Sequence, residues 1–301
     1  MSPAEKKPVK VGRRTIQVSN YDKTLFPDAG ITKGKLIEYY EQVAPLMLAG
    51  LRDRPVALKR FPDGIGKGGF YQKDASAHFP EWLKTVSVQK EGGTLNQVLC
   101  NDAASLVYLA GQAAIEFHVW TSRADRILEP DQIVFDFDPP EDVSFPDVKK
   151  AASEMKALLD EVGLAAFLKT TGSRGLHVVT PIRREHKFEE VQRFARELAG
   201  VLAAKHPDKL TIEVRKAKRK ERIFIDVGRN AYAQHAVAAY SVRALPSAPV
   251  SMPLDWSELS GSKLRPDLFT VRNAAKRIES DPWKGWRRMA RSLPVNTGRG
   301  N

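Results

Sequence analysis

A single cysteine, Cys100, occurs among the 301 residues of this sequence. One thiol can form neither an intramolecular disulfide nor a multi-cysteine zinc site, and so little cysteine is typical of a reducing compartment. Long apolar runs are absent as well, and the basic, proline-containing N-terminus has no apolar signal core. We therefore expect a soluble, cytoplasmic protein with no membrane partner.

Acidic residues are outnumbered. The chain has 48 Lys and Arg against 36 Asp and Glu, which gives a net charge of +12 and a pI near 9.7. This balance favours a polyanionic partner, most often nucleic acid. Charge alone leaves two alternatives, a basic protein without such a partner and a protein that binds anionic membranes. The length suffices for one large domain or two small ones with a buried core.

Internal repeats and low-complexity segments are also missing, and helical and strand-like patterns are mixed along the chain, which predicts a mixed α/β or α+β fold. We expect a flexible basic arm at residues 1–14, one compact unit at 15–294, with two subdomains as an alternative, and a flexible tail at 295–301. Thr32 is expected to cap a helix through about Tyr40, which Pro45 kinks or restarts. Other expected helices are 102–112, 144–162, 188–202 and 267–291, the last interrupted near Pro282. Expected strands are 15–18, 56–61, 114–120, 133–138, 167–170, 176–179, 210–214 and 222–227.

The strand that ends in Phe135-Asp136-Phe137-Asp138 carries the strongest chemical signal. Alternation along a strand puts Asp136 and Asp138 on one face and the two phenylalanines on the other. Neighbouring carboxylates repel unless a cation lies between them, and their oxygens suit Mg²⁺ or Mn²⁺. Pro139 ends the strand and leaves the acids at its tip. The alternative is a solvated strand end with two ordinary surface acids.

A third acid, Asp226, lies in the apolar strand Phe224–Val227. A buried carboxylate without a partner is costly, so Asp226 either faces outward or meets a positive charge. With Asp136 and Asp138 it could complete a nest for two cations, the arrangement that phosphoryl-transfer enzymes use. The alternative is a strand-edge acid paired with a neighbouring Lys or Arg.

The segment from Thr171 to His177 has the parts of a triphosphate cradle. Its glycines expose backbone N–H groups, its hydroxyls and His177 can donate hydrogen bonds, and Arg174 supplies charge. The alternative is an ordinary glycine-rich hairpin with a core-facing histidine. A second glycine-rich stretch, Gly64–Gly69, lacks the Lys-Ser/Thr ending of a phosphate loop, so we expect it to be a hairpin connection.

In this order, the motifs resemble the archaeo-eukaryotic primase superfamily and, more closely, the polymerase domain of bacterial DNA ligase D, the non-homologous end-joining enzyme. The resemblance runs from about Val18 to Pro294. It implies an α+β, primase-like catalytic core with mixed and antiparallel β-sheets flanked by helices. Further matching motifs are Asn20-Tyr21-Asp22-Lys23, Arg54-Pro55-Val56, Phe70-Tyr71-Gln72-Lys73, Glu116-Phe117-His118-Val119 and Tyr240-Ser241-Val242-Arg243.

The resemblance implies a template-dependent repair polymerase that adds ribo- and deoxynucleotides to primer 3′ ends at gaps and double-strand breaks. Asp136, Asp138 and Asp226 would bind two catalytic cations, with Mn²⁺ preferred to Mg²⁺. His118 would line the active site beside the primer end. The incoming triphosphate would be held by Thr171, Ser173, Arg174, His177 and Arg243.

The same resemblance implies contacts with DNA. Lys23 and Lys33 would grip the 5′-phosphate on the far side of a gap, and Phe70 and Tyr71 would stack on a base beside it. Basic residues near template, primer and nucleotide would be Lys59, Lys216 and Arg219.

Three positions depart from the family's commonest pattern but keep its chemistry: Thr171 replaces Ser, Arg174 replaces Lys, and Tyr71 replaces Phe. The implied partners are DNA with gaps or broken ends, nucleoside triphosphates, a ligase module, a nuclease module and the end-binding protein Ku, in a bacterial cytoplasm near the nucleoid. The alternatives are a metal-dependent nuclease, a stand-alone primase and a non-catalytic module that bridges DNA ends.

Overall fold

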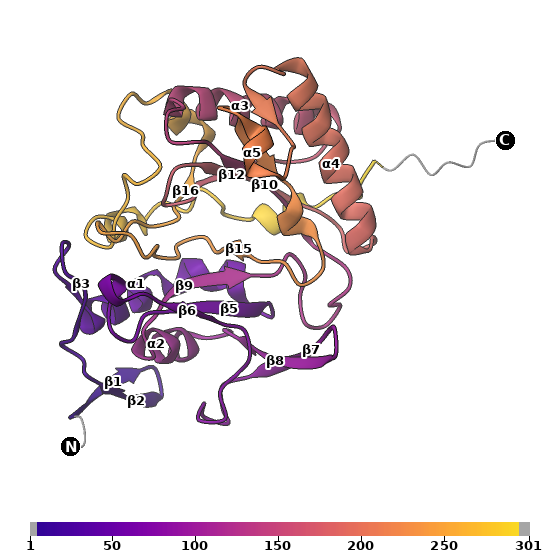
Figure 1. Cartoon of the computed structure of the whole chain (residues 1–301). Helices are drawn as coiled ribbons and strands as arrows, with labels where there is room; N and C mark the ends of the chain where they lie inside the picture. The colour runs from indigo at the N-terminus through magenta and orange to yellow at the C-terminus, as the bar shows by residue number, and fades with distance from the viewer. Residues whose placement is uncertain (1–4, 295–301) are drawn as a thin grey trace.

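Two six-stranded sheets carry the fold of this computed structural model, which describes residues 5–294 (Figure 1). The first sheet has the order β15-β9-β5-β8-β7, with β6 also paired to β5, and the second has the order β13-β14-β10-β12-β11-β16. Only β13 and β14 run parallel; the other paired strands of both sheets are antiparallel. This arrangement confirms the predicted α+β class.

The strands of the first sheet are β5 (Pro55–Arg60), β6 (Phe70–Gln72), β7 (Thr85–Lys90), β8 (Gly93–Leu99), β9 (Ala114–Val119) and β15 (Ala236–Val237). Those of the second are β10 (Gln132–Asp138), β11 (Phe167–Thr170), β12 (Leu176–Pro181), β13 (Leu210–Thr211), β14 (Ile223–Asp226) and β16 (Pro253–Leu254). Two small hairpins pair β1 (Lys6–Val11) with β2 (Arg14–Ser19) and β3 (Thr24–Phe26) with β4 (Ile31–Thr32).

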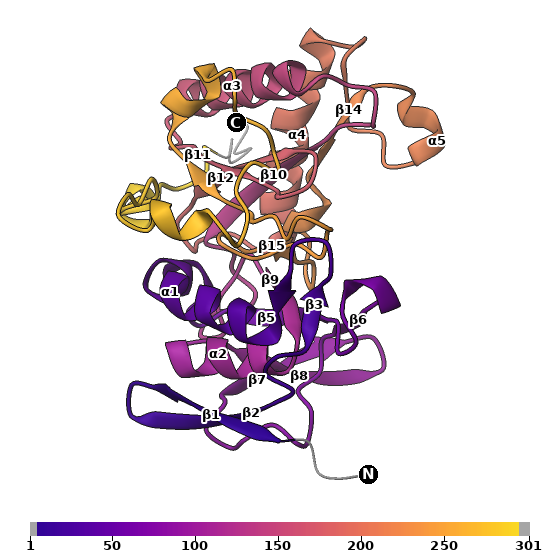
Figure 2. The same ribbon diagram turned by 90° about the vertical axis from the view of Figure 1, so that its left-hand side faces the viewer.

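Helices cover the outer sides of the two sheets (Figure 2). One pair, α1 (Lys33–Leu51) and α2 (Ala103–Gly111), packs beside the first sheet, and another, α3 (Phe145–Glu161) and α4 (Phe188–Lys205), covers the second. A short helix, α5 (Lys216–Arg219), lies in the connection from β13 to β14. A single hydrophobic cluster contains core residues of both halves, among them Leu58, Phe117 and Phe135.

The start of α1 agrees with the sequence prediction, but its length does not. The hydroxyl of Thr32 accepts a hydrogen bond from the Lys35 backbone N–H at 3.3 Å, which is the expected N-cap. Pro45 lies inside one continuous helix that ends at Leu51. Because Met47 and Leu51 are buried in the core, the packing of this last stretch offsets the hydrogen bond that proline removes.

The predicted loose arm at residues 1–14 was wrong for its second half. Lys6–Val11 pairs along its whole length with β2, and Gly12, with φ of +58°, makes the turn between them. The ammonium group of Lys7 lies 3.9 Å from the ring centre of Tyr21, which fixes the hairpin to the body of the protein. Residues 1–4 and the predicted tail at 295–301 lie outside the described residues.

The predicted helix at 267–291 was also wrong. This part of the chain forms only short 3₁₀ turns, at Ala274–Arg277 and Trp286–Met289. Pro282 and Gly285, the latter at φ of +73°, prevent a continuous helix, and aromatic rings of the segment pack on the second sheet instead. The predicted strand at 210–214 is shorter than expected and ends at Thr211. No helix within residues 5–294 has the length and apolar character that a bilayer crossing requires.

Candidate active site

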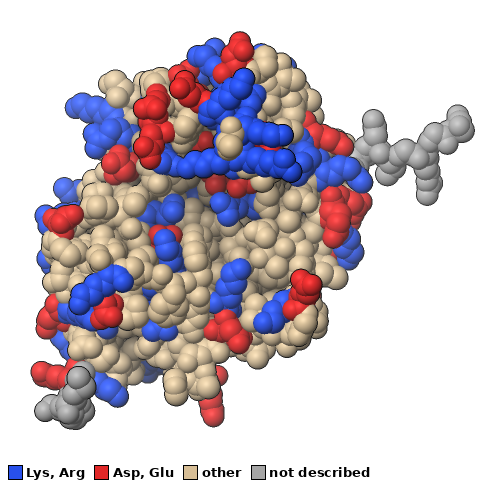
Figure 3. Space-filling model, viewed as in Figure 1, with Lys and Arg blue, Asp and Glu red and all other residues tan. Residues whose placement is uncertain are grey.

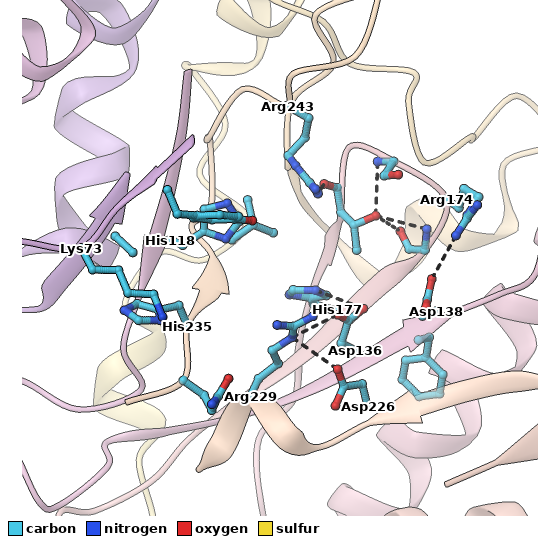
Figure 4. A pocket seen from close by; sticks show the side chains of 18 residues that line it. Lys73, His118, Asp136, Asp138, Arg174, His177, Asp226, Arg229, His235 and Arg243 are labelled. Carbon is cyan, nitrogen blue, oxygen red and sulfur yellow. Dashed lines mark hydrogen bonds and ion pairs between the residues drawn. The ribbon is translucent and has the colours of Figure 1, made fainter. Parts of the chain in front are cut away.

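A cavity of about 580 Å³ lies between the two sheets (Figure 4). Its lining is rich in polar and charged side chains, which come from β9, β10, β12, β14 and the loops around them. The cavity brings together ten residues that the sequence analysis singled out: Tyr71, His118, Asp136, Asp138, Thr171, Ser173, Arg174, His177, Asp226 and Arg243.

Strand register brings the three acids together. Asp136 of β10 lies directly opposite Asp226 of β14, and on its other side it lies opposite His177 of β12. Asp138, two residues further along β10, shares the face of Asp136. The third acid is thus 88 positions from the second in sequence but adjacent to the pair in the sheet, as the sequence analysis predicted.

Arginine side chains lie beside each of these carboxylates. The Nε atom of Arg229 lies 3.4 Å from Asp226 Oδ2 and 3.7 Å from Asp136 Oδ2. The guanidinium groups of Arg174 and Arg219 each lie 3.6 Å from an oxygen of Asp138. Arg174 and Arg219 were predicted to contact nucleotide or DNA, and here they are also counter-ions of a predicted metal ligand.

The carboxylates differ in how easily they ionise. Burial and the nearby charge of Asp136 raise the pKa of Asp138, and the same two causes raise the pKa of Asp226. Burial also opposes the ionisation of Asp136, but its contacts with His177 and Arg229 lower its pKa to about 2. Asp138 and Asp226 therefore lose their protons less readily than free aspartate does.

His177 is neutral near pH 7. Burial and the neighbouring charge of Lys169 lower its pKa to about 4, so its contact with Asp136, 3.3 Å from Nε2 to Oδ1, is a hydrogen bond from a neutral ring. Its other ring nitrogen, Nδ1, is buried and has no hydrogen-bond partner among the described residues. This nitrogen is free to interact with a polar group that enters the site.

The three carboxylates have the chemistry of divalent-cation ligands, but their side chains are not positioned around a common point. Within residues 5–294 no three carboxylate, imidazole or thiol side chains have the spacing of a finished metal site. Arg229 bridges Asp136 and Asp226 instead. Three carboxylates on paired strands supply the hard oxygens that Mg²⁺ and Mn²⁺ prefer, and a raised pKa at Asp138 and Asp226 indicates negative charge that lacks compensation.

Glycines in the turn after β11 permit close backbone packing. Gly172 has φ of +68°, and a Cβ there would lie 2.8 Å from a side-chain carbon of Arg243. A Cβ on Gly175 would lie 1.9 Å from the carbonyl oxygen of Phe137. The Thr171 hydroxyl bonds within the turn, 3.2 Å from the Ser173 N–H and 3.1 Å from the Gly175 N–H. Thr171 thus shapes the cradle, whereas a direct bond to triphosphate was expected.

Glu116 holds the opposite wall in place. Its Oε2 lies 2.9 Å from His118 Nε2 and 3.2 Å from Arg243 Nε, and its Oε1 accepts the Ala244 N–H at 3.0 Å. Lys59 Nζ lies 3.6 Å from the same carboxylate. One buried acid therefore connects the residue predicted to lie beside the primer with the residue predicted to hold phosphate.

Three polar residues of this region were missed as site residues. Arg229 follows Asp226 by three positions in a turn, Glu116 alternates with His118 along β9, and Lys169 is buried beside His177 with its ammonium 2.7 Å from Ser251 Oγ. Alternation on β9 could have identified Glu116. Arg229 and Lys169 gave no such signal, since their importance comes from neighbours that are distant in sequence.

The residues predicted to bind a 5′-phosphate lie outside this cavity. Lys23 pairs with Asp63 at 2.6 Å, while Lys33 is buried and donates to the Ser19 carbonyl oxygen at 2.8 Å. Burial and the charges of Lys23 and Arg60 lower the pKa of Lys33. The contact of Lys33 with a 5′-phosphate stays a prediction; in this structure its ammonium group is bound to the Ser19 carbonyl oxygen.

The predicted stacking pair lies between this lysine cluster and the cavity. Phe70 and Tyr71 are 49% and 56% exposed, unusually open for large rings. On β5, Arg60 lies opposite Phe70 and Lys59 lies opposite Tyr71. Because side chains alternate along β6, Tyr71 reaches the cavity wall and Phe70 turns to the other face.

Lys216 and Arg219 lie on α5, above the cavity. Figure 3 shows lysine and arginine side chains gathered in a band over this part of the molecule. Arg219 points inward and reaches Asp138, whereas Lys216 is exposed. The band gives the rim of the cavity the positive charge that a polyanion requires.

Comparison with known proteins gave matches to a family model and to curated proteins. The family model described as "LigD, primase-polymerase domain" matches residues 32–283. The multifunctional non-homologous end joining protein LigD of Pseudomonas aeruginosa is 32% identical over 293 residues, or 95% of this chain and 35% of that protein. The bifunctional LigD of Bacillus subtilis is 29% identical, covering 88% of this chain and 42% of that protein.

Among solved structures, the polymerase domain of Mycobacterium tuberculosis ligase D in complex with DNA superimposes with a TM-score of 0.84 at 30% identity. The match covers 89% of this chain and 95% of that one. The chain spans about a third to two-fifths of the length of these two curated relatives and nearly all of the solved domain.

Proposed function

Because this chain belongs to the LigD primase-polymerase domain family, we propose that it extends primer 3′ ends at DNA gaps and broken ends, with ribonucleotides preferred to deoxynucleotides. The class of enzyme, a DNA-directed nucleotidyltransferase, follows from the family itself. The observation that supports the mechanism most strongly is the cross-strand pair Asp136–Asp226 beside the cradle Thr171–Gly175 in one cavity.

The nucleotide is proposed to bind with its triphosphate toward the cradle. Arg174 and Arg243 can supply charge-assisted hydrogen bonds to phosphate oxygens, and the Ser173 hydroxyl can add an uncharged donor. The neutral His177 has a single N–H, so it can donate to the triphosphate only after its Nε2–H leaves Asp136. Glu116 fixes the guanidinium of Arg243 through the contact at 3.2 Å, so less side-chain freedom is lost when phosphate binds.

Asp136, Asp138 and Asp226 are proposed to hold two Mn²⁺ or Mg²⁺ ions once Arg229 releases the bridge between Asp136 and Asp226. Such ions, when bound, would lower the pKa of the primer hydroxyl and neutralise charge on the phosphates. His118, which Glu116 fixes through the contact at 2.9 Å, is proposed to orient the primer end. The chain then needs no side chain as general base.

DNA is proposed to cross the positive rim. Lys59, Lys216 and Arg219 would contact template, primer or nucleotide, while Lys23, Lys33 and Phe70 would recognise a downstream 5′-phosphate and the base beside it. The Mycobacterium tuberculosis domain was solved in complex with DNA. Because the curated relatives are described as non-homologous end joining proteins, we also propose that the chain acts in that process. The partners proposed for it, from the resemblance to DNA ligase D, are Ku and ligase and nuclease modules.

A gapped-substrate assay tests this proposal. Primed template with a short gap, Mn²⁺ and labelled ribo- or deoxynucleotide should give a lengthened primer with the wild-type chain. Asp136→Asn with Asp138→Asn should abolish extension and leave DNA binding intact, and Asp208→Asn, at an exposed acid, should change neither. A shortened primer would favour a nuclease, and binding without incorporation under any metal would favour a bridging module.

Recognition of the downstream phosphate is tested separately. Lys23→Ala with Phe70→Ala should remove the preference for gaps with a 5′-phosphate over gaps that end in hydroxyl, because Lys23 lies near the buried Lys33 charge and Phe70 lies against Arg60, the other cation that acts on Lys33. Loss of the stacking contact with one base should weaken the free energy of DNA binding by about 1–3 kcal/mol. If extension on both substrates falls equally, these residues serve another part of the DNA.

A further inference from the structure

A second charged cavity, of about 370 Å³, lies at the other end of β10. We call it the arginine pocket, because five arginines line it: Arg123, Arg126, Arg183, Arg184 and Arg287. Asp131, which precedes the first residue of β10, also lines it, whereas Asp138 of the candidate active site is the last residue of that strand. A strand of this length spans about 20 Å, and the two cavities share no lining residue.

The pocket is held together by three segments that are distant in sequence. Arg123 and Arg126 lie between β9 and β10, Arg183 and Arg184 follow β12 directly, and Arg287 lies in the C-terminal 3₁₀ turn. Backbone hydrogen bonds join these segments: the Ile182 N–H donates to the Asp131 carbonyl oxygen at 3.0 Å, and the Arg183 N–H donates to the Arg291 carbonyl oxygen at 2.9 Å. The cluster is therefore part of the folded scaffold.

Three of the acids near the pocket are paired with arginine, whereas Glu185, which also lines the pocket, has no cationic side chain within 4.0 Å among the described residues and accepts the Ser292 hydroxyl. Asp131 binds two guanidinium groups, the fully buried Arg54 at 2.6 Å and Arg123 at 2.8 Å. Asp125 pairs with Arg184 at 2.6 Å, and Glu129 pairs with Arg126. In the part of the chain that the structure describes, neither Arg183 nor Arg287 has a carboxylate within 4.0 Å. The pocket therefore has more positive than negative charge.

Arg287 carries the clearest sign of a missing partner. Its Nε and Nη2 atoms are shut off from solvent and have no hydrogen-bond acceptor among the described residues. Burial and the guanidinium groups of Arg54 and Arg123 lower its pKa to about 10, so it is still charged near pH 7. A buried charged donor without an acceptor is costly, and the cost disappears when an anionic ligand supplies one.

Guanidinium groups match the oxygens of phosphate in geometry, and several of them together favour an anion with more than one negative oxygen. We propose that the arginine pocket is a second phosphate-binding site, held chiefly by Arg183 and Arg287, and separate from the polymerase centre. The phosphate can belong to the backbone of duplex DNA or to a small ion such as pyrophosphate. The inference does not rest on the proposed function, because none of its residues lies in that site.

Two binding measurements on Arg183→Gln/Arg287→Gln test the proposal, with Arg196→Gln/Arg265→Gln as a control that removes the same charge from exposed positions. The first is fluorescence anisotropy of a labelled blunt duplex over a range of salt. The second is hydrogen exchange of segments 123–131 and 181–187 with inorganic pyrophosphate in metal-free buffer. Circular dichroism melting checks the fold, and Arg183→Gln alone, at an exposed residue, replaces the double variant if that one unfolds.

If the ligand is DNA, the variant should bind duplex about tenfold more weakly than the control. The slope of log K against log salt should also be shallower by about 1–2, because a protein that neutralises fewer phosphates releases fewer counterions when it binds. If the ligand is a small phosphate, pyrophosphate should slow exchange in both segments of the wild type and not in the variant, with duplex affinity equal to that of the control. Variant and control behaving alike with both ligands would overturn the proposal.

Discussion

Glu116 and Asp226 are both carboxylates of the central region, but their surroundings shift their pKa values in opposite directions. Glu116, on β9 of the first sheet, is buried, and contacts from His118, Arg243 and the Ala244 N–H overcome the cost of burial and lower its pKa to about 2. Asp226, on β14 of the second sheet, has Arg229 and the Gly228 N–H as partners, but burial and the negative charge of Asp136 outweigh them and raise its pKa.

This difference in pKa distinguishes a carboxylate with a structural role from carboxylates that are available to bind a cation. Glu116 is fully compensated within the chain, so its role is to fix the positions of Arg243 and His118. The negative charges of Asp226 and Asp138 are incompletely compensated by the protein, so a bound cation would supply the missing positive charge. Substitutions on either side of this contrast should therefore separate the loss of activity from the loss of stability.

The largest effect is expected from Asp226→Asn. Incorporation should fall by about 10⁴-fold, or ~5 kcal/mol in the activation barrier, because a proposed cation ligand is removed. The raised pKa means that the ionised side chain is less favourable in the folded than in the unfolded protein, so unfolding in metal-free urea at pH 7 should show equal or higher stability. Asn can still accept the Gly228 N–H. If the variant is inactive because it is unfolded, Asp226 contributes to stability as Glu116 does, and the proposed difference between the two acids is wrong.

Glu116→Gln should do the reverse. Arg243 and His118 would lose their buried anion, and breaking such a pair costs about 3–5 kcal/mol. The free energy of unfolding should fall by this amount, with a smaller loss of activity that appears mainly as a raised KM for nucleotide. Glu161→Gln, at an exposed acid of α3, is the matched control. Unchanged stability would show that Glu116 is not the anchor of this wall.

Gly175→Ala should push the cradle Thr171–Gly175 away from β10. The new Cβ would lie 1.9 Å from the Phe137 carbonyl oxygen, and backbone atoms on both sides must move to relieve the overlap. Overpacking of this kind costs about 1–3 kcal/mol, and the displaced cradle should raise KM for nucleotide. Gly200→Ala in α4 is the control, since its nearest neighbour would be 3.9 Å away and helix propensity should improve. Equal effects in the two variants would exclude the close approach as the cause.

The smallest effect concerns His235, whose Nε2 accepts the indole N–H of Trp120 at 3.0 Å. Burial lowers its pKa to about 3. Between pH 6.5 and 3 the unfolded chain therefore binds a proton that the folded chain does not, and stability falls as the pH falls. His235→Gln keeps an acceptor and removes this dependence. Relative to the variant, the wild type should lose about 1.4 kcal/mol of unfolding free energy from pH 6 to 5. Parallel pH profiles would mean that the pKa of His235 is the same in the folded and the unfolded chain.

Strand alternation and cap chemistry explain how much could be predicted. Asp136 and Asp138 on one face, the Thr32 cap and the Gly64–Gly69 hairpin connection depend on neighbours within a few residues, and all three are present. The flexible arm at Lys6–Val11 and the helix at 267–291 failed because partners elsewhere in the chain override local preference.

The sequence by itself determined the α+β class, the acidic strand tip, the glycine cradle and the resemblance that identifies the family. These features are local, since they rest on side-chain period, on turn residues and on the order of short motifs. Only the tertiary structure decided that Arg229 bridges two acids, that Lys33 is buried and that Arg287 lacks an acceptor among the described residues. Charge compensation depends on distances between segments that no local pattern records, because Coulomb interactions and desolvation act through space.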